Sequence, residues 1–110
     1  MTPRTDWWHA RSQYPRLRGM DNVASAIVEI RNQLGLHIHP SDLVAKTAVR
    51  FLSRVTIACD GNIADARSVV GLTALGAGLG ARLTIRAEGP DAEAAVAAIR
   101  GLVEGKFGED

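Results

Sequence analysis

The sequence predicts an α+β fold in which four antiparallel strands form one sheet and three helices cover one of its faces. Two periodicities support this fold class. Four segments alternate between apolar and polar residues, as half-buried strands do, and three repeat apolar residues every three or four positions, as amphipathic helices do. The resulting order is β-α-β-β-α-β-α. Strands are expected at residues 25–31, 54–59, 62–66 and 82–87, and helices at 41–54, 68–75 and 89–103.

The first strand and the first helix are predicted by a change along the chain from strand periodicity to helical periodicity. In the strand, Ile27 and Glu29 share one face, while Val28 and Ile30 lie on the other. Pro40 stands near the start of the helix, where a missing N–H is tolerated, and Ser41 is expected to help cap it. The apolar stripe of this helix comprises Leu43, Val44, Thr47, Ala48, Phe51 and Leu52.

The second and third strands are expected to form a hairpin. The Asp60-Gly61 pair between them is typical of a type I′ turn, in which both central residues adopt positive φ. Cys59, the single cysteine, ends the first of these strands. We interpret it as a buried strand residue and not as a nucleophile.

The C-terminal half begins with a short helix for which Ser68 is the expected N-cap. The glycine-rich residues 75–81 then follow a helix, lead into a strand and contain no lysine. A phosphate-binding loop has the opposite order, so we interpret them as a tight helix-to-strand connection. Asp91 stands near the start of the last helix.

Composition favours one small domain that neither spans a membrane nor binds nucleic acid. The chain has 110 residues, 46% of them hydrophobic, and a formal charge of +1. It contains neither a long apolar run nor a secretory signal, which predicts a cytoplasmic protein with no membrane insertion. Basic residues are not concentrated as nucleic-acid binding requires.

Residues 1–22 are expected to be a flexible N-terminal extension, and residues 23–110 the folded domain. The extension contains Trp7, Trp8 and Tyr14 without helical or strand periodicity, and docking of this segment on a partner is the alternative. If it is flexible, deleting it should leave the thermal midpoint nearly unchanged.

His37 is the candidate for chemistry, and three kinds of site can be compared. His37 and His39 alternate as on an extended chain, but zinc sites use at least three protein ligands, and the only other soft candidates are His9 in the extension and Cys59 in a strand. Ser41 follows His39 closely, yet adjacency alone does not make a hydrolase triad. A neutral imidazole can instead attack phosphorus, and a helix N-terminus can hold the resulting phosphate.

Three stretches, in the same order, resemble the HPr family, the histidine-containing phosphocarriers of the bacterial phosphoenolpyruvate-dependent sugar phosphotransferase system. "IRNQLGLHIHP" is similar to the family's N-x-x-G-L-H-A-R-P segment. "ARSVVGLTALGAGLG" is similar to its K-S-hydrophobic-hydrophobic-G-L-x-S-L-G segment, and "LTIRAEGPDAEAAVAAI" to its final strand and helix. The resemblance extends from Ser25 to Glu109 and implies an open-faced sandwich with the order given above.

The resemblance also implies the site and its partners. His37 matches the histidine that the family phosphorylates on Nδ1, receiving the group from enzyme I and passing it to IIA components. Pro40 matches the motif proline, and Ser68 the serine that a kinase/phosphatase regulates in many Gram-positive members. No cofactor or metal is implied, and the protein is expected to be a monomeric, stoichiometric carrier and not an enzyme. The docking surface for partners is expected at Val69, Val70 and Thr73.

The chain departs from the family pattern next to the active histidine. The arginine that pairs with the phosphate is His39 here, so His39 is expected to be the phosphate partner in its place. Ile38 replaces a small residue, and Asp42 adds a carboxylate in the first turn of the helix. These changes keep open an alternative function, a regulatory binding module that acts through the Ser68 helix without carrying sugar-transport flux.

Overall fold

The computed structural model describes residues 22–109, and within them the strands and longer helices follow the predicted order. The expected extension at residues 1–22 lies outside the described residues except for Asn22. The elements are β1 (Val23–Glu29), α2 (Ile38–Ala48), β2 (Arg54–Cys59), β3 (Asn62–Asp65), α3 (Val69–Ala74), β4 (Arg82–Glu88), α4 (Ala92–Glu104) and a short 3-10 segment, η1 (Lys106–Gly108).

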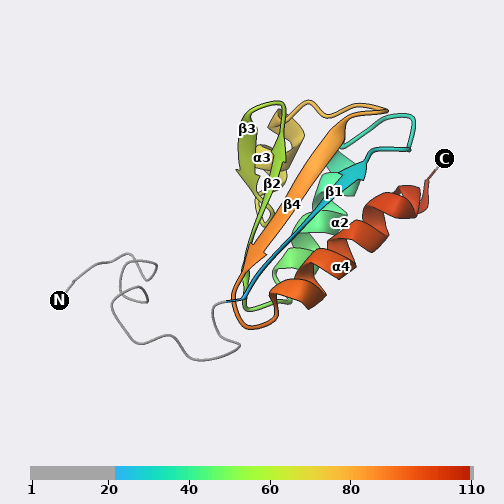
Figure 1. The fold of residues 1–110 in the computed structure, drawn as a ribbon. Coiled ribbons are helices and arrows are strands. Elements are labelled where there is room, and N and C mark those ends of the chain that lie inside the picture. The colour runs from blue at the N-terminus through green and yellow to red at the C-terminus, as the bar shows by residue number, and fades with distance from the viewer. Residues whose placement is uncertain (1–21, 110) are drawn as a thin grey trace.

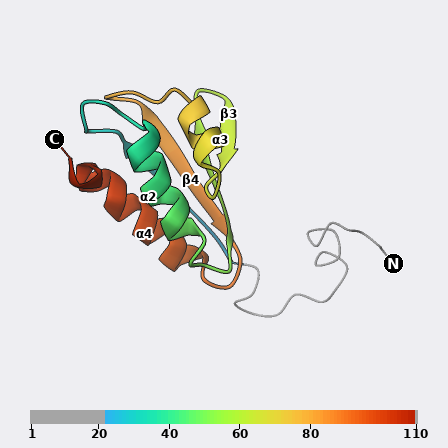
Figure 2. The same cartoon turned by 180° about the vertical axis from the view of Figure 1, so that it is seen from behind.

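One four-stranded sheet has the strand order β1-β4-β2-β3, and every neighbouring pair is antiparallel. Helices α2, α3 and α4 lie on the same face of this sheet, as the two opposite views in Figures 1 and 2 show. Among the residues that the structure describes, the other face carries no helix. The predicted α+β open-faced architecture is therefore confirmed. Within residues 22–109, no helix is long and apolar enough to cross a membrane.

The hairpin between β2 and β3 forms at the predicted turn. Cys59 pairs with Asn62 across the intervening residues Asp60 and Gly61, whose φ angles are 50° and 84°. These positive values are those that a two-residue type I′ turn requires. The turn therefore sets the register of the two strands.

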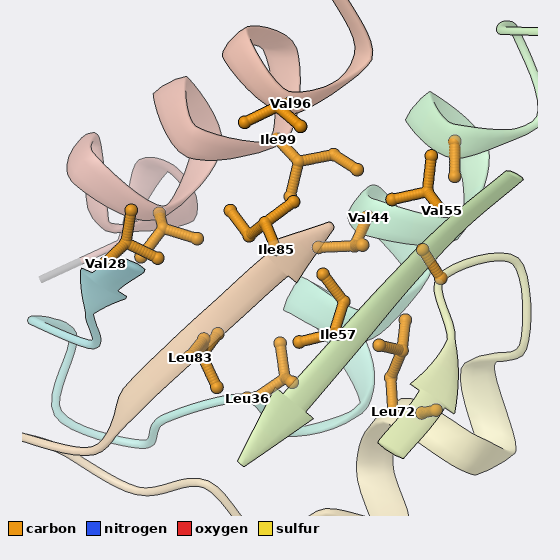
Figure 3. Close-up of a cluster of buried hydrophobic side chains, with 14 of the residues drawn as sticks. Val28, Leu36, Val44, Val55, Ile57, Leu72, Leu83, Ile85, Val96 and Ile99 are labelled. Atoms are coloured by element: carbon orange, nitrogen blue, oxygen red, sulfur yellow. The ribbon is translucent and has the colours of Figure 1, made fainter. Parts of the chain in front are cut away.

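The core fills the space between the sheet and the helices (Figure 3). Alternate strand side chains such as Ile57 and Ile85 point toward the helices, where they meet Val44 of α2 and Ile99 of α4. Cys59 is buried as predicted. Burial raises the pKa of the Cys59 thiol, which keeps it protonated and a poor nucleophile.

The first helix differs from the prediction at both ends. It begins at Ile38, three residues before the expected start, and ends at Ala48. The apolar periodicity continues beyond that point, but Leu52 is 83% exposed, so its assignment to the buried stripe was wrong. The backbone N–H groups of Leu52 and Ser53 donate to the Asp91 carboxylate, and this contact holds the chain outside the helix.

Smaller differences affect the ends of the other elements. β1 begins at Val23 and ends at Glu29, although Ile30 continues the pairing through hydrogen bonds with Ala81 and Gly80.

The predicted N-cap of α3 is confirmed, because Ser68 Oγ accepts a hydrogen bond from the Gly71 N–H at 2.9 Å.

Candidate functional site

His37 is the N-cap residue of α2. Its backbone is extended, with φ −79° and ψ −168°, and its carbonyl accepts the first helical hydrogen bond from the Ser41 N–H at 3.0 Å. Pro40 lies within the first turn and has no N–H to leave unpaired. The backbone N–H groups of Ile38 and His39 lie in the first turn, so the helix itself supplies no carbonyl to accept their hydrogen bonds. The N-terminus of α2, where the helix dipole places a partial positive charge, therefore lies beside an imidazole.

A compact loop before His37 sets the position of this residue. Asn32 is fully buried, and its side-chain amide donates to the Gly35 carbonyl at 2.8 Å. Gly35 has a φ of 69°, and the next residue, Leu36, donates its N–H to the Ala77 carbonyl at 2.8 Å. The glycine-rich connection after α3 therefore supports the loop.

Ser41 does not cap the helix, contrary to the prediction. It is fully buried, and its hydroxyl donates to the Leu36 carbonyl at 3.3 Å. The reason is its place in the sequence: α2 begins at Ile38, so Ser41 already lies in the helix interior. Its hydroxyl instead ties the first turn to the loop that precedes His37.

The carboxylate of Glu109 lies against the ring of His37. The His37 Nε2 atom is 3.0 Å from Glu109 Oε1 and 3.1 Å from Oε2. The buried Asn32 amide donates its second hydrogen to Glu109 Oε1 at 2.9 Å. The His37 and Glu109 side chains are 31% and 26% exposed, so both are partly shielded from water.

This contact determines which nitrogen of a neutral His37 ring is protonated. Hydrogen bonds from His37 and Asn32 hold the pKa of Glu109 below its usual range, so the carboxyl group is ionised at neutral pH. An ionised carboxylate can only accept hydrogen bonds. Nε2 of His37 must therefore carry the proton, which leaves a lone pair on Nδ1.

His39 lies on the first turn of α2 and is exposed. Its ring centroid is 6.5 Å from that of His37, and the two rings are tilted by 41°. Ile38 between them is 67% exposed, and the Asp42 carboxylate forms an ion pair with Lys46 at 2.9 Å. Among residues 22–109, no three His, Cys, Asp or Glu side chains are grouped as a metal site requires.

The expected docking residues lie on α3, which packs beside α2. Val70 is 80% exposed, and Thr73 is exposed with its hydroxyl bonded to the Val69 carbonyl. Val69 itself is partly buried, and Ser68 is partly buried at the helix start. The structure therefore presents Val70 and Thr73 to solvent.

Glu109 is the site residue that sequence reasoning missed. It is 72 residues from His37 in the chain and stands among the last residues, where a carboxylate is ordinarily a solvated group. No local motif links the two positions. The turn that brings Glu109 toward His37 contains Lys106 and Phe107, both with positive φ. Lysine and phenylalanine rarely adopt positive φ, so neither residue indicates such a turn in the sequence.

Comparisons with known proteins agree on one family. A family model described as "PTS HPr component phosphorylation site" matches residues 24–105. Phosphocarrier protein HPr of Treponema pallidum is 37% identical over 83 residues, which cover 76% of this chain and 94% of that protein. Phosphocarrier protein HPr of Cupriavidus necator is 38% identical over 80 residues, covering 73% and 90%.

A similar solved structure is that of HPr-C-His from Thermoanaerobacter tengcongensis. It superimposes with a TM-score of 0.75 at 37% sequence identity, and the match covers 79% of this chain and 98% of that one. The phosphocarrier HPr from Bacillus anthracis superimposes with a TM-score of 0.70 at 33% identity, covering 74% and 96%.

Proposed function

The chain belongs to the HPr family of phosphocarrier proteins, and from this membership we propose that His37 accepts a phosphoryl group from phospho-enzyme I and passes it to IIA components of the sugar phosphotransferase system. The group is carried on Nδ1 of the ring. The protein acts stoichiometrically, since each cycle requires the active site of a partner.

One observation carries this proposal: His37 caps α2 while its Nε2 atom is bonded to Glu109. Nδ1 is the ring nitrogen nearer the backbone of His37, and His37 is the residue that caps the N-terminus of α2. A phosphoryl group on Nδ1 would gain from the helix dipole and from the N–H groups of Ile38 and His39.

The transfer step needs no proton to leave His37. The Nδ1 lone pair forms the new N–P bond while the bond from phosphorus to the donor's leaving group breaks, and the leaving group takes that electron pair. The product ring keeps its proton on Nε2, facing the Glu109 carboxylate. Transfer to the next acceptor reverses the roles and returns the lone pair to Nδ1.

His39 is proposed to assist this step in place of arginine. It lies in the first turn of α2 near the His37 ring, where a protonated imidazole would attract a phosphate. Arginine carries a permanent charge and a fork of donors, whereas a histidine is charged only in part of the physiological pH range. The aid from His39 is therefore conditional on pH.

Partners are proposed to dock over α2 and α3 together. Ile38 and Val70 expose apolar side chains on these two adjacent helices, close in the chain to His37 and Ser68 respectively. Val69 and Thr73 complete the α3 part of this surface. Covering it would exclude water from the N–P bond during transfer.

A second candidate function is a regulatory binding module that acts through α3. The exposure of Val70 beside Ser68 favours it, because an HPr kinase/phosphatase or another regulator could reach this end of the helix. In that case the protein would accept phosphate without supporting sugar transport.

Label transfer distinguishes the two functions. The protein is incubated with enzyme I and labelled phosphoenolpyruvate, and a IIA component is then added. A carrier takes up acid-labile label and loses it to the IIA component, whereas a regulatory module retains it. Failure of the wild-type protein to take up any label would contradict both phosphorylation by enzyme I and the carrier role.

A further inference from the structure

The last residues of the described chain form a turn that returns toward the active histidine. α4 ends at Glu104, and both views place this end beside the loop that joins β1 to α2 (Figures 1 and 2). Lys106, Phe107 and Gly108 have φ angles of 57°, 54° and 78°. Three consecutive positive values reverse the chain direction after the helix, and Glu109 then contacts His37.

This turn is anchored and is not a loose end. Phe107 is only 4% exposed and belongs to the hydrophobic core. A left-handed conformation is unfavourable for lysine and phenylalanine, so it persists only where other contacts enforce it. Burial of the Phe107 ring provides such a contact. The conformation therefore fixes the direction in which the chain leaves the core.

The carboxylate of Glu109 is held from two sides. Asn32, buried in the loop before His37, donates to Oε1 at 2.9 Å, and the His37 ring contacts both oxygens. The Asn32 amide also holds the Gly35 carbonyl, so the same side chain links Glu109 to the loop that positions His37. The His37 ring is thereby connected to a rigid loop through its Nε2 atom.

We propose that Glu109 is a positioning residue for phosphoryl transfer, which holds the His37 ring in the orientation and protonation state that leave Nδ1 free to attack phosphorus. This inference rests on the proposed function. A carboxylate that accepts from one ring nitrogen fixes both the tautomer and the rotation of an imidazole. Without it, part of the His37 population would carry its proton on Nδ1 and could not form the N–P bond.

Glu109→Gln is the informative variant, because it keeps the size of the side chain. The glutamine side chain can accept a hydrogen bond from the ring N–H through its carbonyl oxygen or donate one to a ring nitrogen through its NH2 group, so either tautomer of His37 is accommodated. Glu109→Asp keeps the carboxylate and should retain part of the effect. The matched control is Glu104→Gln, which removes a charge from an exposed carboxylate at the end of α4 that pairs with Arg100.

The experiment combines nitrogen NMR of the His37 ring with the initial rate of phosphorylation by enzyme I. In the wild type and in Glu104→Gln, we expect the signals of a ring protonated on Nε2 alone. In Glu109→Gln, they should move toward the average of two tautomers. The phosphorylation rate should fall about tenfold, the lower end of what carboxylate partners of metal-binding histidines contribute. The thermal midpoint should stay near that of the wild type.

The outcomes separate this inference from the proposed function. Unchanged ring signals and an unchanged rate in Glu109→Gln would overturn the positioning role while leaving His37 as the acceptor. If the wild type took no phosphoryl group, the carrier function would fail. The ring signals alone would then test the positioning role of Glu109. Mixed tautomers in the wild type would show that Glu109 does not fix the protonation state of the His37 ring.

Discussion

The backbone carbonyl of Ala77 accepts a hydrogen bond from the N–H of Leu36 at 2.8 Å. The segment after α3 thus supports the residue that immediately precedes His37. The contact depends on Gly35, because a Cβ atom there would lie 2.4 Å from the same carbonyl oxygen. The chemistry proposed for His37 therefore depends on a close approach of two backbone segments.

Gly35→Ala should destabilise the protein by about 2 kcal/mol or more, since it combines a left-handed backbone with a backbone clash. Gly61→Ala is the matched control: its φ is also positive, but no atom lies within 4 Å of the added Cβ. Urea unfolding of both variants isolates the effect of the contact. Equal losses of stability would mean that the approach of Gly35 to Ala77 contributes nothing.

Ser68→Ala should lower the free energy of unfolding by about 1 kcal/mol, because the hydroxyl that accepts from the Gly71 N–H is lost. Ser68→Asp keeps a capping oxygen and should restore most of this stability. If α3 is the docking surface, the added negative charge should also slow phosphorylation by enzyme I. An unchanged transfer rate in Ser68→Asp would leave Ser68 with a structural role only.

His39→Arg tests the conditional charge beside His37. Phosphorylation equilibria of the wild type and the variant are measured with the same enzyme I from about pH 6 to 8, the range in which imidazole loses its charge. Dividing the equilibrium constant of the variant by that of the wild type cancels the effect of titratable groups on enzyme I, which is common to both. The ratio should move in favour of arginine as pH rises, because only histidine becomes neutral. A flat ratio would show that His39 does not meet the phosphate.

Asp91 joins α4 to the loop after α2 and makes part of the stability depend on pH. Burial raises the pKa of Asp91, but hydrogen bonds from Ser53 and Leu52 outweigh burial and bring it below the ordinary value of 3.8. The folded state thus favours the ionised form. The resulting stabilisation is present above the unfolded-state pKa and is lost as pH falls through the lower folded-state value.

Asp91→Asn should therefore be less stable than the wild type at pH 7, and the difference should shrink in strongly acidic solution. Urea unfolding at a series of pH values measures it. Glu93→Gln, in the first turn of the same helix, serves as the control for loss of a carboxylate. A difference that does not change with pH would show that the hydrogen bonds to Asp91 do not depend on its charge.

The fold was predictable because its determinants are local. Alternation in β2 and β4 and the Asp60-Gly61 pair indicate strands and a hairpin without reference to distant residues. Helix α2 was less predictable, since its N-cap is His37, which acts through its backbone and makes no side-chain capping bond. Its end at Ala48 depends on the contact of Leu52 with Asp91, which is distant in sequence.

The candidate site was predictable only in part, for the same reason. The residues around His37 identified it as a candidate and placed it at the N-terminus of a helix. Glu109 could not, because its contact with His37 depends on the left-handed turn at Lys106 and Phe107 and on the burial of the phenylalanine ring. Tertiary packing, and no local pattern, brings the carboxylate to the imidazole.

Combined phosphorus and nitrogen NMR of the protein, after incubation with enzyme I and phosphoenolpyruvate, tests whether Nδ1 of His37 accepts the phosphoryl group. We expect one acid-labile phosphoryl group that is coupled to Nδ1 of His37 and absent from His37→Ala, whereas His39→Ala retains it. Coupling to Nε2, or a phosphoryl group that persists in folded His37→Ala, would show that Nδ1 of His37 is not the acceptor.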